Sequence, residues 1–447
     1  MKKLFTRILL CMFLLMGVQH ARADHMVGSD ITWECMGKDT FKITVTAYRD
    51  CNGIPFPNTP ISLKPSCGGA TIVAGGDLSG GTDITPVCKK ACTRCKSKAC
   101  DYPTGVPYGI EQYFITAIVV LPTNCCKFAV SWGHCCRSAG ITTGPTWNDY
   151  YIEGELNRCT TPCDNSPYFT NPPVALYCAG QCVTYNQGVN DDDVDGNGAA
   201  DSLAYFLAEP MQSKSSTVNW ASPFSYKEPL TYDGFPGHAN DGEWNPPKKC
   251  QGFTLDVETG ELRFKAMSGG EVTVLAIRVE EWRKDADGKP QKIGEIRRDL
   301  QILIVDCPDN RSPIISGING GNQVTMDFCA GQSKCFTINS FDVDDKDSVT
   351  MTSNVNRTIP GATFDVESGK RFPKGVFCWT PSNADVRSYP YRFVVTGVDD
   401  ACPVNGRTSR SFGIKVNPSP EASYSATIGN CGLVTFKAFP GKITAIS

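Results

Sequence analysis

The chain has little of what an enzyme, a nucleic-acid binder or a membrane-spanning protein requires. Beyond residue 23, no stretch approaches the roughly 20 apolar residues that a membrane-spanning helix needs. The net charge of −3 provides no basic field for nucleic acid. Only His25, His134 and His238 follow residue 23, and the zinc-protease, serine-hydrolase and P-loop motifs are missing. We therefore expect a non-catalytic protein that does not bind nucleic acid.

The N-terminus has the pattern of a cleavable export signal. Three cations near the start precede an apolar run over residues 8–18. Ala21-Arg22-Ala23 then supplies small residues at both signal-peptidase positions. We expect cleavage after residue 23 and a secreted protein that is displayed on the extracellular cell surface.

Cysteine is abundant, and 22 of the 23 cysteines follow the predicted signal. An even number in an oxidising compartment favours disulfides, although the connectivity cannot be derived from the sequence. The N-terminal third holds fifteen disulfide candidates: Cys35, Cys51, Cys67, Cys88, Cys92, Cys95, Cys100, Cys125, Cys126, Cys135, Cys136, Cys159, Cys163, Cys178 and Cys182. The spacing of those between residues 88 and 100 also fits a zinc site, but outside the reducing cytosol disulfides are favoured.

The hydrophobic periodicity is that of β-strands. Phe41, Ile43 and Val45 alternate with polar residues. Similar runs occur over residues 113–120, 271–279, 300–305 and 391–395. No segment has a convincing amphipathic helical pattern, and 42 Gly and 30 Pro punctuate the short runs. The sequence therefore predicts an all-β fold of tandem antiparallel β-sandwiches with a disulfide-rich N-terminal domain.

Two segments share an ordered set of local features, which indicates an internal repeat. Each opens with a Ser-Pro pair, at Ser166-Pro167 and at Ser312-Pro313, and each continues into an acidic loop. Each then reaches an acidic pair near the end of a strand, Glu280-Glu281 or Asp399-Asp400. Only the first copy holds a long insertion, from about residue 219 to 250, and loops tolerate such insertions.

The repeat and the proline-rich junctions divide the chain into five predicted parts. These are the signal peptide (1–23), a Cys-rich N-terminal β domain (24–163), a first sandwich module with an acidic loop (164–307), a second module (308–417) and the start of a further module (418–447). The last part is too short for a sandwich, so we expect the sequence to be a fragment of a longer protein.

The clearest ligand motif is the acidic loop over residues 193–201, which fits D-x-D-x-[DN]-G-x-x-D. Ca²⁺ prefers six to eight oxygen ligands, and a glycine allows the sharp turn that brings them together. The predicted calcium ligands are the side chains of Asp193, Asp195, Asn197 and Asp201 and the carbonyl of Ala199. An alternative register starting at Asp191 lacks the final glutamate of an EF-hand, and a solvated acidic turn without metal is the other alternative.

A second acidic loop is a weaker candidate. Asp342, Asp344 and Asp347 lack the glycine of the first loop, and Asp399 could complete a cadherin-like site from a distant strand. An acidic β-turn without metal explains these residues nearly as well.

The insertion of the first repeat is rich in aromatic residues: Trp220, Phe224, Tyr226, Tyr232, Phe235 and Trp244. We expect them to pack the long loop on its own sandwich. The alternative is a platform for a sugar or a protein.

Two stretches near the start of the mature chain carry a family resemblance. Residues 25–35 (HMVGSDITWEC) and 41–51 (FKITVTAYRDC) resemble the N-terminal region of large Bacteroidota surface proteins of the PKD-domain or gliding-motility-associated C-terminal-domain type. The likeness covers roughly residues 25–307. Residues 311–417 resemble an immunoglobulin-like or cadherin-like repeat, and the tail resembles the start of a PKD-like module. The resemblance implies type IX secretion and an adhesive or structural role, and it supplies no catalytic residues.

The sequence therefore predicts a calcium-stabilised stalk or adhesin segment that acts in cell-surface adhesion or gliding motility. Its partners would be extracellular glycans or proteins. The alternative is a carbohydrate-binding accessory region of a larger secreted enzyme. A catalytic module beyond residue 447 would favour the alternative, and further immunoglobulin-like or PKD-like modules would favour the adhesin.

Overall fold

The computed structural model describes most of the chain after residue 25. The described residues are 26–55, 58–146, 148–159, 161–173, 176–193, 201–246, 248–285, 287–307, 310–367, 369–419, 423–428 and 434–439. Within them the secondary structure is almost entirely β, as predicted. The helical elements are α2 (Val355–Thr358) and the 3₁₀ turn η1 (Asn383–Asp385). No described helix is long and apolar enough to cross a membrane.

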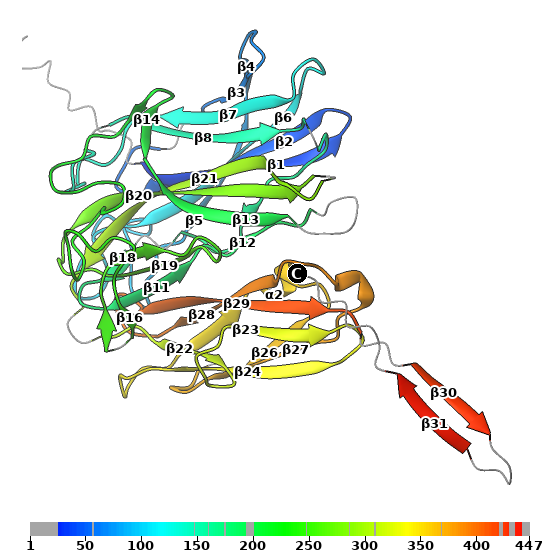
Figure 1. Ribbon diagram of the computed structural model, residues 1–447. Helices are drawn as coiled ribbons and strands as arrows, with labels where there is room; N and C mark the ends of the chain where they lie inside the picture. Colours follow the sequence, from blue (N-terminus) through cyan, green and yellow to red (C-terminus); the bar gives the residue numbers. More distant parts are fainter. Residues whose placement is uncertain are drawn as a thin grey trace, which may run out of the picture.

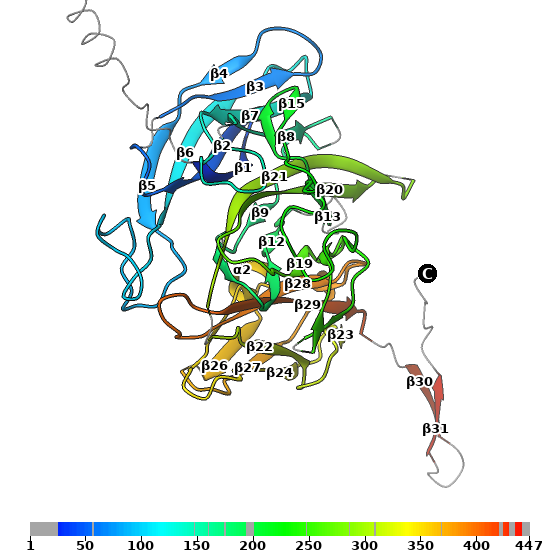
Figure 2. The same ribbon diagram turned by 90° about the vertical axis from the view of Figure 1, so that its left-hand side faces the viewer.

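The strands fall into four groups along the chain. The N-terminal part contains β1 (Met26–Gly37), β2 (Thr40–Asp50), β3 (Ile61–Pro65), β4 (Ile72–Ala74), β5 (Asp77–Asp83), β6 (Ile110–Val120), β7 (Lys127–His134) and β8 (Tyr150–Asn157). The second module contains β22 (Ile314–Ile318), β23 (Thr325–Cys329), β24 (Lys334–Phe341), β25 (Thr350–Ser353), β26 (Thr363–Glu367), β27 (Lys374–Trp379), β28 (Tyr391–Val398) and β29 (Arg407–Asn417). The tail contains β30 (Ser423–Ile428) and β31 (Val434–Phe439), which lie apart from the sandwiches in Figures 1 and 2.

The first module contains more and shorter strands. They are β9 (Tyr168–Phe169), β10 (Leu176–Cys178), β11 (Cys182–Asn186), β12 (Val189–Asn190), β13 (Ser202–Ala208), β14 (Met211–Ser213), β15 (Ser216–Thr217), β16 (Trp244–Asn245), β17 (Lys249–Cys250), β18 (Phe253–Leu255), β19 (Glu261–Lys265), β20 (Val272–Lys284) and β21 (Pro290–Val305).

The N-terminal strands and the first module share one large sheet. Its main path has the order β4-β3-β7-β8-β21-β1-β2-β6-β5, so β21 of the first module lies between β8 and β1. Gly28 of β1 pairs with Leu300 of β21, and Leu156 of β8 pairs with Gly294. The domain boundary that we place at residue 163 therefore separates strands that belong to the same sheet.

The first module is a two-sheet sandwich. One sheet has the order β11-β19-β18, and the other consists of β10, β21, β20 and β13, in which β10 runs parallel to β21. The short pair β9–β12 adds to the end of β11. In immunoglobulin nomenclature β10 is strand A′, β11 is B, β13 is C, β18 is D, β19 is E, β20 is F and β21 is G. The two sheets therefore have the orders B-E-D and A′-G-F-C, which are typical of immunoglobulin-like sandwiches.

The second module repeats this topology. Its sheets have the orders β22-β24-β27-β26 and β23-β29-β28-β25, and β23 runs parallel to β29. The strand order A-B-E-D and A′-G-F-C therefore matches that of the first module, which confirms the predicted internal repeat. The chain is an all-β protein of tandem immunoglobulin-like or cadherin-like sandwiches.

Alternating apolar residues build each core. In β2 the side chains of Phe41, Ile43 and Val45 are fully buried, as the period of two predicts. The core of the second module contains a column of phenylalanines, in which Phe377 stacks on Phe336 at 4.8 Å and on Phe393 at 5.0 Å between ring centroids. Aromatic burial of this kind supplies much of the stability of a small sandwich.

All fifteen cysteine candidates form disulfides in the structure. The pairs are Cys35–Cys163, Cys51–Cys95, Cys67–Cys125, Cys88–Cys402, Cys92–Cys100, Cys126–Cys159, Cys135–Cys136, Cys178–Cys307, Cys182–Cys250 and Cys335–Cys378. Cys88–Cys402 joins the N-terminal part to the second module across 314 residues. The disulfides are therefore not confined to the N-terminal domain.

Candidate metal centres

An acidic site lies at one end of the first module, where the loop after β12 begins. The Oδ1 atom of Asp191 accepts a hydrogen bond from the backbone N–H of Asp193 at 3.0 Å. The carboxylate of Asp193 in turn accepts the backbone N–H and the side-chain amide of Asn165, each at 2.6 Å. These bonds fix the start of the loop against the segment that leads into β9.

The second module repeats these contacts at its own acidic loop. The Oδ1 atom of Asp342 accepts the N–H of Asp344 at 2.8 Å, and Asp344 accepts the N–H of Arg311 at 2.7 Å. The contacts make Asp342 equivalent to Asp191, Asp344 equivalent to Asp193, and Arg311 equivalent to Asn165.

Strand register identifies the acidic residue that each module contributes from its F strand. In β20, Val279 pairs with buried Tyr205, and Glu281 follows two residues later on the same face. In β28, Gly397 pairs with buried Met351, and Asp399 follows on the same face. Glu281 is therefore the counterpart of Asp399. This member of each predicted acidic pair lies buried in the acidic site, and Asp400 lies at the margin of the second site, where it accepts the N–H of Ser348.

Two further positions complete each site. Asp201 directly precedes Ser202, the first residue of the C strand β13. Asp347 directly precedes Ser348, which lies just before the C strand β25. Asp164 and Asn310 precede the equivalent residues Asn165 and Arg311. Single oxygen atoms of Asp164, Asp201 and Glu281 lie within 4.8 Å of one another, and so do those of Asp342, Asp344 and Asp347.

Several oxygen atoms in both sites are buried without a donor. No N–H group of the described residues donates to Asp191 Oδ2 or to either oxygen of Glu281, and the carboxyl groups of these two residues lie close enough to share a proton. Asp342 Oδ2 and Asn310 Oδ1 also lack a donor among the described residues, whereas the carboxylate of Asp399 lies beside the side-chain amide of Asn310. Glu281 and Asp342 are fully buried, and Asp399 is 4% exposed. Because an unpaired buried charge is costly, such oxygens indicate a place for a cation.

The pKa values of these carboxyl groups are raised, mainly because burial disfavours the charged form. Burial raises the pKa of Asp164 to about 8 and that of Asp191 to about 7. The pKa of Glu281 is raised well above its usual value by burial and then by the neighbouring charge of Asp191. Burial also raises the pKa of Asp399 to about 7 and that of Asp342 to about 6. The negative charges therefore repel one another in both sites.

Guanidinium groups lie beside both sites but contact them differently. In the second site Arg371 donates to the backbone carbonyls of Asp342 and Val343. Nε of Arg311 lies 4.0 Å from Asp344.

In the first site Nε of Arg283 donates to Asp201 at 2.6 Å, and its terminal nitrogen donates to Asp164 at 3.0 Å. The carboxylate of Asp164 replaces the neutral amide of Asn310. Of these guanidinium groups, that of Arg283 bridges two carboxylates of its site.

Only some of the predicted calcium ligands lie among the described residues. Asp195, Asn197 and Ala199 lie outside the described residues. Asp193 binds Asn165, and Asp201 pairs with Arg283 at the site. In the second loop Asp342, Asp344 and Asp347 lie together. Burial raises the pKa of Asp399, and the nearby negative charge of Asp342 raises it further.

The sequence prediction did not assign Asp164, Glu281 or Asn310 to a site. Each comes from a segment far from the acidic loop in sequence, so a loop motif cannot contain it. Aligning the two repeats at their Ser-Pro pairs would have placed Asp164 opposite Asn310. The alternation of side chains along β20 would then have identified Glu281, and not Glu280, as the residue that faces the site.

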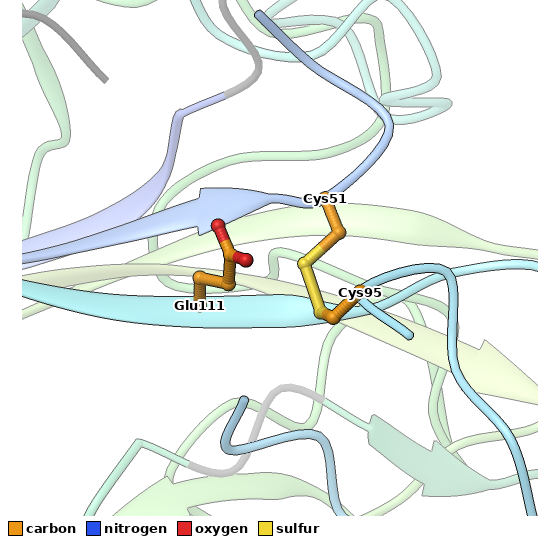
Figure 3. A group of neighbouring side chains, drawn as sticks. All are labelled: Cys51, Cys95 and Glu111. Atoms are coloured by element: carbon orange, nitrogen blue, oxygen red, sulfur yellow. A yellow bond between two sulfur atoms is a disulfide. The ribbon is translucent and has the colours of Figure 1, made fainter. Parts of the chain in front are cut away.

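The cysteine-rich groups do not offer metal ligands. Cys51, Cys95 and Glu111 lie close together, but Figure 3 shows the two sulfur atoms bonded to each other. The carboxylate of Glu111 instead accepts a hydrogen bond from Arg49 at 2.5 Å. Cys88, Cys92 and Cys100 are also disulfide-bonded, so the zinc alternative has no thiolates in this segment.

Comparisons with known proteins do not identify a family. A scan against protein-family profiles finds no match, and a search of curated proteins finds no significant similarity. Among solved structures, Drosophila N-cadherin EC1-4 is 14% identical with a TM-score of 0.20, and 65% of this chain and 67% of that chain are covered. A complex of Dpr2 Ig1-Ig2 with DIP-Theta Ig1-Ig3 matches at 7% identity and a TM-score of 0.18, covering 84% and 94%. Scores this low carry no argument about this chain.

Proposed function

We propose that this chain is a non-catalytic extracellular segment in which calcium ions brace tandem β-sandwiches for adhesion. Each ion would bind one of the two equivalent acidic sites. The first would use Asp164, Asp191, Asp201 and Glu281, and the second would use Asn310, Asp342, Asp347 and Asp399. Secretion, surface display and a role in gliding motility belong to the same proposal and rest on the sequence.

The observation that carries the proposal is the repetition of one arrangement of acidic side chains in two modules, with Arg283 as an additional group at the first site. The ligand atoms are carboxylate and amide oxygens, which hard Ca²⁺ prefers over nitrogen or sulfur. Both sites combine a segment before the A strand, the B–C loop and the F strand. A cation at either place would therefore tie together three segments that are distant in sequence.

The position of the second site favours a bracing role. Asn310 lies between the two modules, where the side chain of Gln181 donates to its carbonyl at 2.5 Å. Gln181 also accepts a hydrogen bond from the hydroxyl of Ser312 at 2.6 Å. A cation bound to Asn310 would stiffen this junction, and stiff tandem modules hold binding surfaces away from the cell.

Calorimetric unfolding in calcium and in chelator tests the proposal. Saturating Ca²⁺ at about 100 times its dissociation constant should stabilise the chain by about 2.7 kcal/mol for each site. Mg²⁺ at the same concentration should have a smaller effect, because it demands a tighter octahedral geometry. Identical unfolding curves in Ca²⁺ and in chelator would refute calcium bracing.

A further inference from the structure

The turn between β28 and β29 of the second module carries one residue of the second acidic site and contacts another. It begins at Asp399, because the last pair of the two strands is Val398 with Arg407. Later in the same turn, the backbone carbonyl of Val404 accepts a hydrogen bond from the side-chain amide of Asn310 at 3.4 Å. The shape of the turn therefore sets the positions of two of the four residues that we assign to the second calcium ion.

Within the turn, backbone groups fix the side chain of Asp399. Its Oδ1 atom accepts the N–H groups of Ala401 at 3.1 Å and Gly406 at 2.8 Å. Its Oδ2 atom accepts neither, and the carboxylate lies beside the side-chain amide of Asn310. The side-chain amide of Asn405 closes the turn, because it donates to the carbonyls of Asp399 and Ala401 at 2.9 and 3.0 Å. The turn thus orients Asp399 through one oxygen and leaves the other available to a cation.

The Cys-rich N-terminal domain clamps this turn from outside. Cys402 of the turn is bonded to Cys88, and the N–H of Cys88 donates to the carbonyl of Pro403 at 3.0 Å. Val404 forms a β-bridge with Val87 and is buried in an apolar cluster with residues of the N-terminal part and of the first module. A disulfide, a hydrogen bond and apolar packing therefore hold three consecutive residues of the turn against other parts of the chain.

The equivalent carboxylate of the first module is held in a different way. Glu281 lies within the sheet, where it pairs with Leu203 of β13 on one side and with Gly294 of β21 on the other. Asp399 lies one residue beyond Val398, which is the last paired residue of β28 toward both of its neighbouring strands. Strand pairing therefore fixes the backbone of Glu281, whereas the turn and its clamp fix that of Asp399.

We propose that the Cys88–Cys402 disulfide is a positioning element of the second calcium site. It holds the β28–β29 turn in the conformation that binds the ion, and it leaves the first site unaffected. This inference rests on the proposed calcium function and identifies an element that regulates one of the two sites. A released turn holds the binding conformation for only part of the time, and the apparent affinity for calcium falls by that fraction.

Calorimetric titration of the full chain with Ca²⁺ tests the proposal, and each site can be observed alone. Glu281→Gln leaves the second site, and Asp399→Asn leaves the first. In the Glu281→Gln background, Cys88→Ser/Cys402→Ser should raise the dissociation constant about tenfold, as expected if the released turn is competent for about a tenth of the time. In the Asp399→Asn background the same pair should change nothing. An unchanged constant in the first background, or an equal rise in both, would overturn the proposal.

Two further variants separate positioning from a general loss of stability. Cys335→Ser/Cys378→Ser removes a disulfide of the same module near the start of β24, whereas Asp342 follows the end of that strand. It should lower the melting temperature without changing the calcium affinity. Asn405→Ala loosens the turn but keeps every disulfide and every proposed ligand, so it should weaken the second site. Wild-type affinity in Asn405→Ala, or a loss in the control as large as that caused by opening the clamp, would contradict the assignment.

The coupling must also appear in the disulfide itself, because linkage between two equilibria is reciprocal. The full chain is equilibrated with mixtures of reduced and oxidised dithiothreitol, in Ca²⁺ and in chelator. In this exchange the dithiol is oxidised to its cyclic disulfide as the two cysteines are reduced to thiols. Alkylation and mass spectrometry should show that Ca²⁺ lowers the reduced fraction of Cys88 and Cys402. Equal reduced fractions in both conditions would contradict the coupling.

The titrations distinguish this inference from the calcium function on which it rests. Calcium binding to the disulfide-intact Glu281→Gln chain, with an affinity that does not change when the clamp is opened, would refute the positioning role only. No calcium binding to that chain would refute both the second calcium site and its regulation.

Discussion

The two modules build the same acidic site but balance its charge in different ways. The first module has an extra carboxylate, Asp164, which pairs with Arg283. The second has neutral Asn310, and its neighbouring guanidinium groups contact Asp344 and the loop carbonyls. The geometry that both share is therefore independent of this local substitution. We infer that the arrangement of oxygen atoms is the property that the repeat preserves.

The modules also differ in how they join their neighbours. The first continues the N-terminal sheet through β21 and a buried ion pair, in which Arg298 lies 2.6 Å from Asp30 of β1. The second is joined by the Cys88–Cys402 disulfide and by side-chain contacts such as Glu261 with the N–H of Ser411, at 3.1 Å. Attachment of the second module should therefore be more sensitive to reduction than that of the first.

The largest expected effect comes from removing the long-range disulfide. The double substitution Cys88→Ser/Cys402→Ser opens a loop of 314 residues, which costs on the order of 5 kcal/mol in the chain-entropy model. We expect calorimetry to show a separate, earlier transition for the second module. A single transition at the wild-type temperature would show that the noncovalent contacts alone hold the module.

Substituting the guanidinium of the first site should have the next largest effect. Arg283→Gln leaves the buried carboxylates of Asp164 and Asp201 without their partner, and breaking such a pair costs about 3 kcal/mol. Adding Asp164→Asn makes the first site resemble the second and should recover part of this loss. Chemical denaturation in chelator measures both variants, and strictly additive effects would contradict the charge-compensation account.

Calcium stabilisation should divide between the two modules. Glu281→Gln and Asp399→Asn should each remove one increment of about 2.7 kcal/mol at a calcium concentration of about 100 times the dissociation constant. The double variant should be insensitive to calcium. Asp400→Asn is the control, because Asp400 is exposed and accepts the backbone N–H of Ser348 at 2.8 Å. Its charge acts on Asp347, so this variant should change the calcium affinity without removing the site. Loss of the calcium response in the control would contradict the selection of Asp399.

The calcium-free chain should also show a pH dependence of its stability. Burial raises the pKa of Asp164 to about 8 and those of Asp191 and Asp399 to about 7, whereas the unfolded values are about 3.9. The folded state therefore binds more protons than the unfolded state between about pH 4 and 8, and stability in chelator should fall as the pH rises through this window.

Calcium requires the ionised carboxylates, so its stabilising increment should grow over the same range. Melting temperatures at several pH values, with and without chelator, measure both trends. Stability in chelator that rises from pH 5 to 8 would contradict the raised pKa values.

Local sequence patterns were sufficient for much of the fold. The alternation of Phe41, Ile43 and Val45 predicts the buried face of β2, and the shared Ser-Pro and acidic features predict two modules of one topology. The sharing of one sheet by the N-terminal part and the first module was not predictable in this way. It depends on β21 pairing with β1, and strands more than 250 residues apart leave no local signal.

The candidate sites show the same limit. The acidic loops are visible as runs of aspartate, so Asp193, Asp201 and Asp342 were found directly. Glu281 lies in the site because of its position in the register of β20. Asp164 lies there because of the path of the segment that leads into the A strand. A linear loop motif therefore finds one of the three segments that build each site, and comparison of the repeats is needed to find the others.

The most direct test of the account is the number of calcium ions bound by the full chain. Equilibrium dialysis against Ca²⁺, followed by elemental analysis, should give two tightly bound ions per chain for the wild type. It should give one ion for Glu281→Gln, one for Asp399→Asn and none for the double variant. One ion in the wild type that is lost with only one of these substitutions, or two ions that both substitutions leave in place, would contradict the equivalence of the two sites.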